Sequence, residues 1–411
     1  MPGNTLKRQC CIVGGGPAGM MAGLLFARAG IDVIVLEKHA DFFRDFRGDT
    51  IHPSTFQLIH ELGMLNDFLK IPQQEIKQLG AMFNNHFLKL ADFSHLPVAK
   101  PAIGLMPQWD FLSFLAEKAE RYPNFHLMME ANFNDLVEEN GKLRGIKANT
   151  PQGEIKINAP LIIGADGRHS DVRQKAGLKV ITTGVPIDVL WFKLSKRSGD
   201  PLQSLGHFHY GKIMVMLDRN DYWQCGYVIS KGDLEKIKIQ GLQTFGKALT
   251  EVVPFLKNRV HELKDWEQIK LLSVVIDHLK EWQREGLLCI GDAAHAMSPI
   301  GGVGINLALQ DAVAAANILY KPLLEGKPMD ASLLKKVQKR REFPTRLTQK
   351  LQVRIQKGIV SRRLEEKKVQ KPPFLMRLLN KWPLLRRIPA RLIGIGIRPE
   401  HIRVPEKNKD N

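Results

Sequence analysis

The residue types best suited to chemistry gather in one stretch, from Cys289 to Ala312, with the sequence CIGDAAHAMSPIGGVGINLALQDA. A carboxylate, Asp292, follows a short apolar run, and Pro299 and three glycines at 301, 302 and 304 come after it. Glycines let backbone N–H groups approach a ligand, and the helix expected from about Val303 adds partial positive charge at its N-terminus. The stretch therefore predicts an anion-binding loop between a strand and a helix. An ordinary strand–loop–helix connection would also account for the glycines.

A second glycine loop, G-x-G-x-x-G at 14–19, directly follows an apolar run near the start of the chain. A helix is expected after it, then a strand that ends at Glu37, and this order is the context of a dinucleotide-binding βαβ unit. Gly14 allows the tight turn, Gly16 lets a pyrophosphate approach the backbone, and Gly19 lets helix and strand pack closely. Glu37 favours an adenosine ribose without a 2′-phosphate, as in FAD or NAD.

A third site follows the apolar run at 161–164, where Asp166 stands at the expected C-terminal end of a buried strand. Ligands of α/β sheets bind at the carboxyl ends of the strands. Asp166 and Asp292 are thus two carboxylates at one predicted edge, and Arg173 lies in the helix expected after the first of them.

Between residues 180 and 276 the pattern changes to alternating strands, which predicts a largely antiparallel sheet inserted into the α/β domain. His207 and His209 share one face of a strand, because side chains alternate along a strand. That face is the predicted pocket wall, with His207, Tyr210 and Trp223 as substrate contacts. Aromatic residues on such a sheet are more often core.

The net charge of +18 is concentrated at one end of the chain. Residues 331–411 hold 23 of the 60 Lys and Arg but 6 of the 42 Asp and Glu, a net charge of +17. This basic helical region could dock its apolar face on the body or contact an anionic membrane surface. No uncharged apolar run reaches the roughly 18 residues of a membrane span, no cleavable leader is recognised, and the four cysteines show no metal-ligand spacing.

The three sites together resemble the para-hydroxybenzoate hydroxylase-like family, the single-component FAD-dependent aromatic hydroxylases. The matching segments are 14–19 with Glu37, GADGRHSDVR at 164–173, and GDAAH at 291–295 continuing through Pro299 to Asp311. The resemblance implies an α/β fold: a Rossmann-like FAD-binding domain of the glutathione reductase type, an inserted, mainly antiparallel β-sheet substrate domain, and a helical C-terminal tail. Family members with a separate thioredoxin-like C-terminal domain are not matched, since the tail is expected to be short, helical and basic.

By that resemblance, Glu37 would hold the adenosine ribose and Asp292 the ribityl chain. Arg47 and Gln108 would lie along FAD, the backbone of 301–304 would face the pyrimidine edge of the flavin, and Asp166 and Arg173 would serve FAD and NAD(P)H. The predicted cofactor-binding residues are Gly14, Gly16, Pro17, Ala18, Gly19, Glu37, Lys38, Arg47, Gln108, Asp166, Arg173, Gly291, Asp292, Pro299, Gly301, Gly302, Val303, Gly304 and Ile305.

The reaction implied by the family uses NADPH or NADH to reduce the flavin, and dioxygen then forms a C4a-hydroperoxide that oxygenates an aromatic or polycyclic substrate. His52, His207 or His209 could act as a base, since histidine titrates near neutrality; His52 and His209 are the predicted catalytic residues. The alternatives are an FAD-dependent dehydrogenase or reductase of a lipid or isoprenoid, and a non-enzymatic flavin-binding protein. No nucleic acid partner or metal is expected, and the predicted location is cytoplasmic, with a possible peripheral membrane contact through the tail.

The predicted division of the chain is discontinuous. The FAD-binding domain is expected at 1–75, 101–180 and 280–325, the substrate domain at 76–100 and 181–279, and the basic helical C-terminal region at 330–411.

Overall fold

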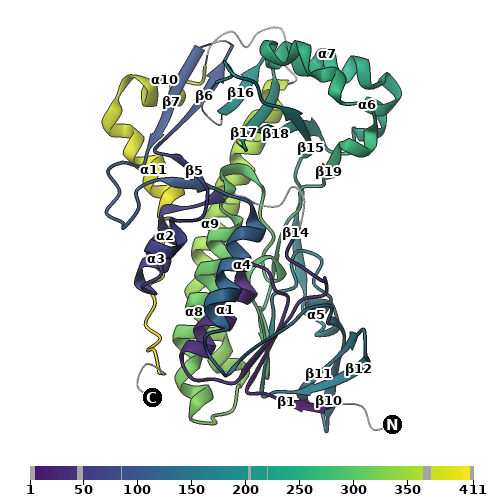
Figure 1. Cartoon of the computed structure of the whole chain (residues 1–411), viewed down its shortest axis with the longest axis vertical. Helices are drawn as coiled ribbons and strands as arrows, with labels where there is room; N and C mark the ends of the chain where they lie inside the picture. Colours follow the sequence, from purple (N-terminus) through teal and green to yellow (C-terminus); the bar gives the residue numbers. More distant parts are fainter. Residues whose placement is uncertain are drawn as a thin grey trace.

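The structure is a computed structural model, and it describes residues 5–43, 50–84, 86–201, 205–219, 221–363 and 372–407. An α/β body forms one end of the molecule and a largely antiparallel sheet forms the other, while long helices run along the body (Figure 1). The predicted fold class, an FAD-binding α/β fold with an inserted sheet and a helical C-terminal region, is confirmed.

The body is organised around a sheet to which six of the described strands belong. Its four central strands are apolar and buried on both faces, and this is why continuous runs such as VIVL and LIIG form parallel strands here. Every neighbouring pair of strands is parallel, except that the edge strand β21 pairs with its neighbour in the antiparallel direction. The order is β21 (Gln283–Arg284), β22 (Leu287–Cys289), β13 (Leu161–Gly164), β2 (Cys10–Val13), β3 (Val33–Leu36) and β9 (Phe125–Met128).

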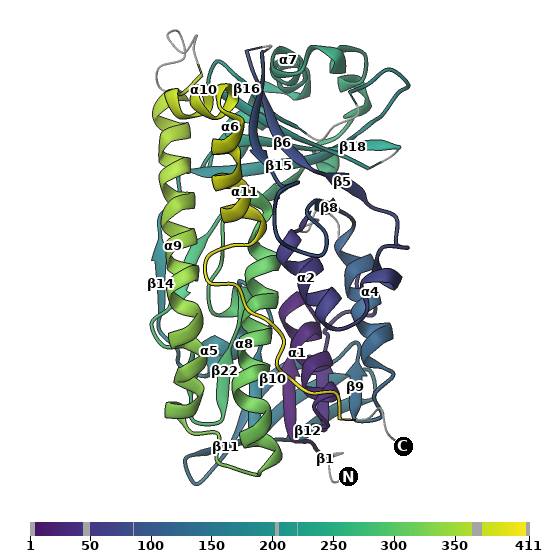
Figure 2. The same cartoon turned by 90° about the vertical axis from the view of Figure 1, so that its left-hand side faces the viewer.

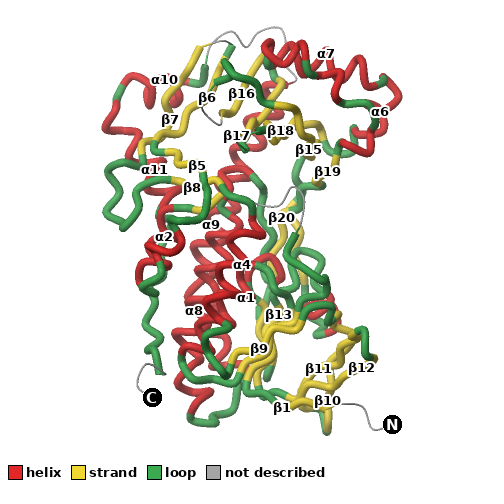
Figure 3. Tube along the Cα trace, viewed as in Figure 1, coloured by secondary structure: helices red, strands yellow, loops and turns green. Residues whose placement is uncertain are grey.

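Helices α1 (Pro17–Arg28), α4 (Gln108–Ala119), α8 (Gly304–Leu324) and α9 (Ala331–Arg363) pack side by side along the body (Figures 2 and 3). Helix α8 lies at the centre, and nearly all of its first sixteen residues are buried. Among the described residues, the segment 300–324 is the one helix long and apolar enough to cross a membrane, but 72% of its apolar window is buried inside the protein. It is therefore a core helix.

A smaller sheet of the body contains a tight hairpin. Asn140 and Gly141 have φ angles of 53° and 72°, so the Asn-Gly pair turns the chain between two antiparallel strands. The described strands of this sheet are β1 (Thr5–Lys7), β12 (Gly153–Asn158), β11 (Lys142–Thr150) and β10 (Asn132–Glu139). Two short ribbons complete the body: β4 (Thr50–Ile51), β8 (Ile103–Leu105) and β5 (Gln74–Ile76), and β14 (Val180–Thr183) with β20 (Ile276–Leu279).

Seven of the described strands form the large sheet at the other end. One face, here called the outer face, packs on helix α7 (Leu242–Val252) and contains Trp223 and Tyr227. The opposite inner face contains Val189, Ile213 and Val228 and is packed by Ile300. The strand order is β19 (Lys270–Leu272), β15 (Ile187–Ser195), β18 (Tyr222–Ser230), β17 (Lys212–Asp218), β16 (Leu205–His209), β6 (Gln78–Phe83) and β7 (His86–Asp92).

The C-terminal region returns along the molecule after α9. Helices α10 (Phe374–Lys381), η6 (Pro383–Arg386) and α11 (Arg387–Gly394) pack against β7, and the last described residues run back down the body to α1 (Figure 2). The remaining helices are α2 (Pro53–Glu61), α3 (Leu65–Phe68), α5 (Asp171–Lys175), α6 (Leu234–Gln240), η1 (Pro254–Asn258), η2 (Val260–Glu262), η3 (Trp266–Gln268), η4 (Gly291–Ala293) and η5 (Ile300–Gly302).

Candidate active site

The loop at 14–19 has the geometry of a dinucleotide-binding turn. Gly14 has a φ of +108°, and a Cβ there would lie 2.4 Å from the Ala165 carbonyl oxygen; a Cβ on Gly19 would lie 1.9 Å from the Gly14 oxygen. Both positions therefore require glycine. Pro17 begins α1, where a missing backbone N–H costs no hydrogen bond.

Two observations at this loop fit a bound nucleotide. A Cβ on Gly16 would meet no atom within 4 Å, and its φ of −74° suits any residue. Neither packing within the protein nor the backbone conformation therefore requires glycine at this position. The Gly15 N–H donates to the Glu37 carboxylate over 3.1 Å, and this bond holds the acidic residue beside the loop. The free space at Gly16 is where a pyrophosphate would approach the backbone.

Asp166 and Arg173 organise the second motif. The Ser170 hydroxyl and the Val172 N–H donate to Asp166 over 2.5 and 3.1 Å. Burial raises the pKa of Asp166 even though these bonds act in the opposite direction. The guanidinium of Arg173 forms a two-pronged ion pair with Asp277 and also donates to the Ala293 carbonyl oxygen, next to Asp292. Arg173 thus ties α5 to the loop that carries Asp292.

Asp292 occupies the predicted place at the end of β22. Its side chain is partly exposed, and Arg168 approaches it at 3.5 Å. The preceding glycine, Gly291, has a φ of +59°, and a Cβ there would lie 3.0 Å from the Ala18 Cβ. This close approach brings the start of α1 and the Asp292 loop together, so one extended ligand can contact both glycine motifs.

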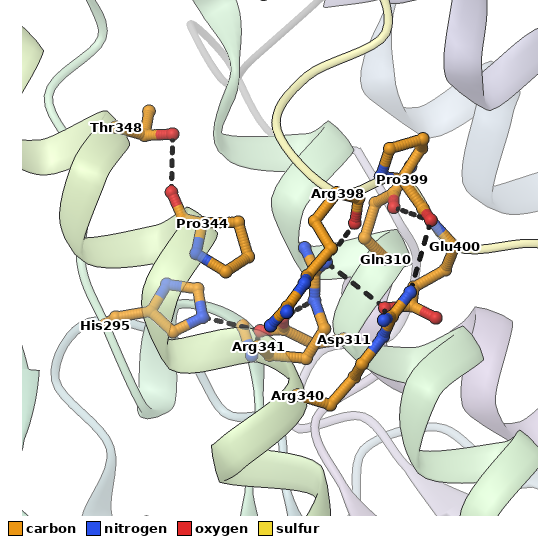
Figure 4. A network of polar contacts seen from close by, with 11 residues as sticks. His295, Gln310, Asp311, Arg340, Arg341, Pro344, Thr348, Arg398, Pro399 and Glu400 are labelled. Carbon is orange, nitrogen blue, oxygen red and sulfur yellow. Dashed lines mark hydrogen bonds and ion pairs between the residues drawn. The ribbon is translucent and has the colours of Figure 1, made fainter.

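Figure 4 shows a buried polar network around Asp311, which the sequence did not predict. The carboxylate of Asp311, fully buried in α8, accepts from the Gly291 N–H at 3.1 Å, from His295 Nε2 at 2.5 Å and from Arg341 Nε at 3.0 Å. Burial alone would raise the pKa of Asp311, but His295 and Arg341 outweigh it and lower the pKa. A lone acid in the apolar face of a predicted helix was the available signal.

The loop at 299–304 leads into the uncapped N-terminus of α8. Gly301 and Gly302 have φ angles of 83° and 62°, no side chain caps the helix, and its first turn contains no acidic residue. A Cβ on Gly304 would meet no atom within 4 Å. Backbone N–H groups at this end are available to a ligand that carries partial negative charge.

Three buried glutamines of α9 hold the segment before this loop. The Gln352 amide donates to the Ser298 and Ile300 carbonyl oxygens over 3.0 and 2.9 Å, and its oxygen accepts from the Ser298 N–H. Gln356 donates to the Ser298 hydroxyl, and Gln349 to the Ala296 carbonyl oxygen. Glutamines at helical spacing in a basic helix were the signal that sequence reasoning passed over.

His52 joins the glycine loop to the C-terminal region. It is fully buried, with Nε2 at 2.9 Å from the Gly302 carbonyl oxygen and Nδ1 at 2.8 Å from the Ile393 carbonyl oxygen. Burial lowers the pKa of His52, and the two carbonyl oxygens act in the opposite direction. With both ring nitrogens facing backbone, the residue is placed to position the loop, and its predicted role as a base stays a prediction.

Other predicted cofactor residues lie at the margins of this arrangement. Gln108 is half-buried at the first residue of α4, Lys38 is exposed beside Glu37, and Arg47 lies outside the described residues. Pro299, Val303 and Ile305 surround the glycines at the start of α8, as expected; their contact with a cofactor stays a prediction.

The histidines and Trp223 lie on the outer face of the large sheet, away from the glycine loop. His207 pairs with Met214 and shares its outer face, whereas the intervening Phe208 is on the inner face with Ile213. Desolvation lowers the pKa of His207 to about 4. Desolvation also lowers the pKa of His209, and Lys212 acts in the same direction.

Trp223 is buried against the α7 side, and its indole N–H donates to Asp200 at 2.8 Å. Tyr210 is at a hairpin tip, with a φ of 40°. The expected pocket wall of His207, Tyr210 and Trp223 is therefore not assembled opposite the loop. The covering helix α7 decides which face is outer, and the strand pattern does not contain that information.

Comparison with known proteins defines the class. Residues 7–351 match the family model described as FAD binding domain. The chain is 30% identical over 356 residues to a 6-methylpretetramide 4-monooxygenase from Streptomyces rimosus, which covers 86% of this chain and 84% of that protein.

Among solved structures, p-nitrophenol 4-monooxygenase from Pseudomonas putida matches with a TM-score of 0.77 and 18% identity, over 97% of this chain and all of that one. Anhydrotetracycline hydroxylase from Streptomyces rimosus matches with a TM-score of 0.75 and 20% identity, over 96% and 77%.

The protein is thus an FAD-dependent oxidoreductase. More particularly, it belongs to the para-hydroxybenzoate hydroxylase-like family of flavoprotein monooxygenases, as the three sequence motifs predicted.

Proposed function

We propose that this protein is a monooxygenase that hydroxylates an aromatic or polycyclic small molecule, with NADPH or NADH and dioxygen as co-substrates. One observation carries the proposal. The glycine loop at the uncapped start of α8 lies against the apolar inner face of the large sheet, where Ile300 packs on the cluster that contains Val189 and Ile213. A flavin ring at this loop would have an apolar surface on its far side, as oxygen transfer to an aromatic ring requires.

The chain offers FAD a continuous set of contacts. Glu37 would hold the adenosine ribose, the space at Gly16 would take the pyrophosphate, and Asp292 would hold the ribityl chain. When bound, FAD supplies hydride acceptance and the activation of dioxygen. Backbone N–H groups at the start of α8 would stabilise negative charge on the ring without a titrating side chain.

We propose Trp191 as a substrate-orienting residue in place of Trp223. It belongs to the inner face, and its ring lies over Gly226, where a Cβ would be 3.0 Å from the indole. Its Nε1 atom is buried and has no hydrogen-bond partner within the described part of the chain. A buried donor without a partner is costly, so an oxygen on the substrate is a suitable acceptor.

The decisive experiment is a screen of electron-rich aromatic compounds with the FAD-loaded enzyme in labelled dioxygen. At least one compound is expected to accelerate NAD(P)H oxidation, and its product should contain one labelled oxygen atom. Product without label would favour a dehydrogenase or reductase instead, and the absence of any accelerating compound would favour a non-enzymatic flavin-binding protein.

The same assay tests Trp191. Trp191→Phe removes the donor and keeps an aromatic side chain, so KM for an oxygen-bearing substrate should rise about fivefold, the value of one net hydrogen bond. The flavin absorption spectrum should not change. Trp266→Phe, on the α7 side of the sheet, is the matched control and should leave KM unaltered. An unaltered KM in Trp191→Phe would remove Trp191 from the site.

We also propose that the enzyme works in the cytoplasm. Its four cysteines are buried thiols, and desolvation raises the pKa of Cys11 to about 12, which keeps it protonated.

A further inference from the structure

The segment from α10 to α11 presents an apolar surface that no part of the described chain covers. Its outward side chains are between 40 and 71% exposed, a large value for residues of this size. We call this set the apolar rim. Its members are Phe374, Leu375, Trp382, Leu384, Ile388 and Leu392.

The opposite side of the same segment is firmly attached. Ala390 and Ile395 are buried in a cluster with Phe93 and Leu105, and Asn380 accepts from the Lys89 N–H at 3.0 Å. The guanidinium of Arg386 donates to the last carbonyl oxygens of α10. These contacts hold the segment in place, so the exposed apolar area of the rim is not explained by attachment of the segment to the body.

Cations accompany the rim. Residues 372–399 contain six Lys and Arg and no Asp or Glu. Arg387 and Arg391 form one exposed row on α11, and Ile388 and Leu392 form the adjacent exposed row, because residues four apart share a helix face. Lys381 is exposed in the same way at the end of α10. The surface thus combines projecting apolar side chains with charge of a single sign.

We propose that the apolar rim docks on the surface of an anionic lipid bilayer. Apolar side chains would enter the interfacial layer while the neighbouring arginines and lysine meet the headgroups, and Trp382 is a residue type enriched at that depth. A second copy of this chain is a poorer occupant, because a symmetric contact would bring two uniformly cationic surfaces together. The proposal is independent of the reaction that the enzyme catalyses.

The test is sedimentation of the full-length, FAD-loaded protein with vesicles. Phosphatidylcholine vesicles with and without 30% phosphatidylglycerol are compared at low salt. The wild-type protein should bind the anionic vesicles, and its binding should weaken as salt is added. Neutral vesicles should bind at least tenfold less protein.

Two variants separate the apolar and ionic contributions. The triple variant F374S/L384S/I388S should lose at least nine-tenths of binding, and R387Q/R391Q should weaken binding about fivefold for each cation removed. Flavin content and Tm should be unchanged, because all of these side chains are exposed. The matched control is Ile239→Ser on α6, which is 86% exposed beside Lys236 and Lys238 and should bind as the wild type does.

Three results would overturn the proposal. The first is a wild-type protein that does not bind anionic vesicles, and the second is undiminished binding by the triple variant. The third is a dimer in lipid-free buffer that the triple variant disperses, since this would assign the rim to a second copy of the chain.

Discussion

The loops at 14–19 and 299–304 both bring glycines to the start of a helix, but different parts of the chain hold them. The first is fixed by its own βαβ unit and by the strand beside it, through Glu37 and the backbone of Ala165. The second is fixed from outside, by His52, by Gln352 of α9 and, through the segment before it, by Asp311. If the two loops hold the pyrophosphate and the flavin ring as proposed, the phosphate site is built locally, whereas the position of the ring depends on the whole fold.

The strongest way to test this difference is to remove the buried anchor of the second region. Asp311→Asn would leave the buried Arg341 guanidinium with only its longer contact to Glu400, at 3.4 Å, and the free energy of unfolding should fall by about 3–5 kcal/mol. Urea denaturation measures it. Glu342→Gln, which breaks the partly exposed pair with Arg346, should cost less than about 1 kcal/mol.

Asp292→Ala provides the contrast within the same region. This carboxylate is partly exposed and is approached by Arg168 at 3.5 Å, so the unfolding free energy of the FAD-free protein should be unaltered. FAD occupancy should nevertheless fall sharply. An Asp292→Ala protein with a normal flavin spectrum would contradict the assignment, and an Asp311→Asn protein as stable as the wild type would show that the second region is not held as described.

The next test compares two glycines of the first loop. Gly14→Ala would place an alanine in a backbone conformation with positive φ, and its Cβ would clash with Ala165. The FAD-free protein should therefore be destabilised by about 2–3 kcal/mol. Gly16→Ala meets no atom and has an ordinary φ, so that protein should be as stable as the wild type but bind FAD at least tenfold more weakly. Equal stability losses in both variants would show that Gly16 serves the fold and not the cofactor.

The smallest effect is expected at Gln352. Gln352→Ala would leave a buried N–H and two carbonyl oxygens near the second loop without partners, at a cost of about 1–3 kcal/mol. The flavin absorption band should shift or broaden, because the loop proposed to face the ring would loosen. Arg354→Ala, two residues along on the exposed side of α9, is the control. A Gln352→Ala protein with an unchanged spectrum would contradict external support of the loop.

The sequence predicted the central strands of the body well. Parallel strands buried on both faces are continuous apolar runs, and here a motif follows the carboxyl end of several of them. It predicted the strands of the large sheet too, but not which face of that sheet meets the loop at 299–304. Alternation shows that His207 and Phe208 point to opposite sides, and only the position of α7 decides that Phe208 is on the inner one. The supporting residues His52, Asp311 and Gln352 act across 16 to 341 positions, beyond any local pattern.

The contacts of His52 have one further consequence. A neutral imidazole carries its single proton on one nitrogen at a time, and burial lowers the pKa of this ring. With the proton on Nδ1, His52 bonds the tail at Ile393; with the proton on Nε2, it bonds the loop at Gly302. The two tautomers therefore make these bonds alternatives, so that the attachment of the C-terminal helix and the attachment of the loop at 299–304 compete for one hydrogen atom.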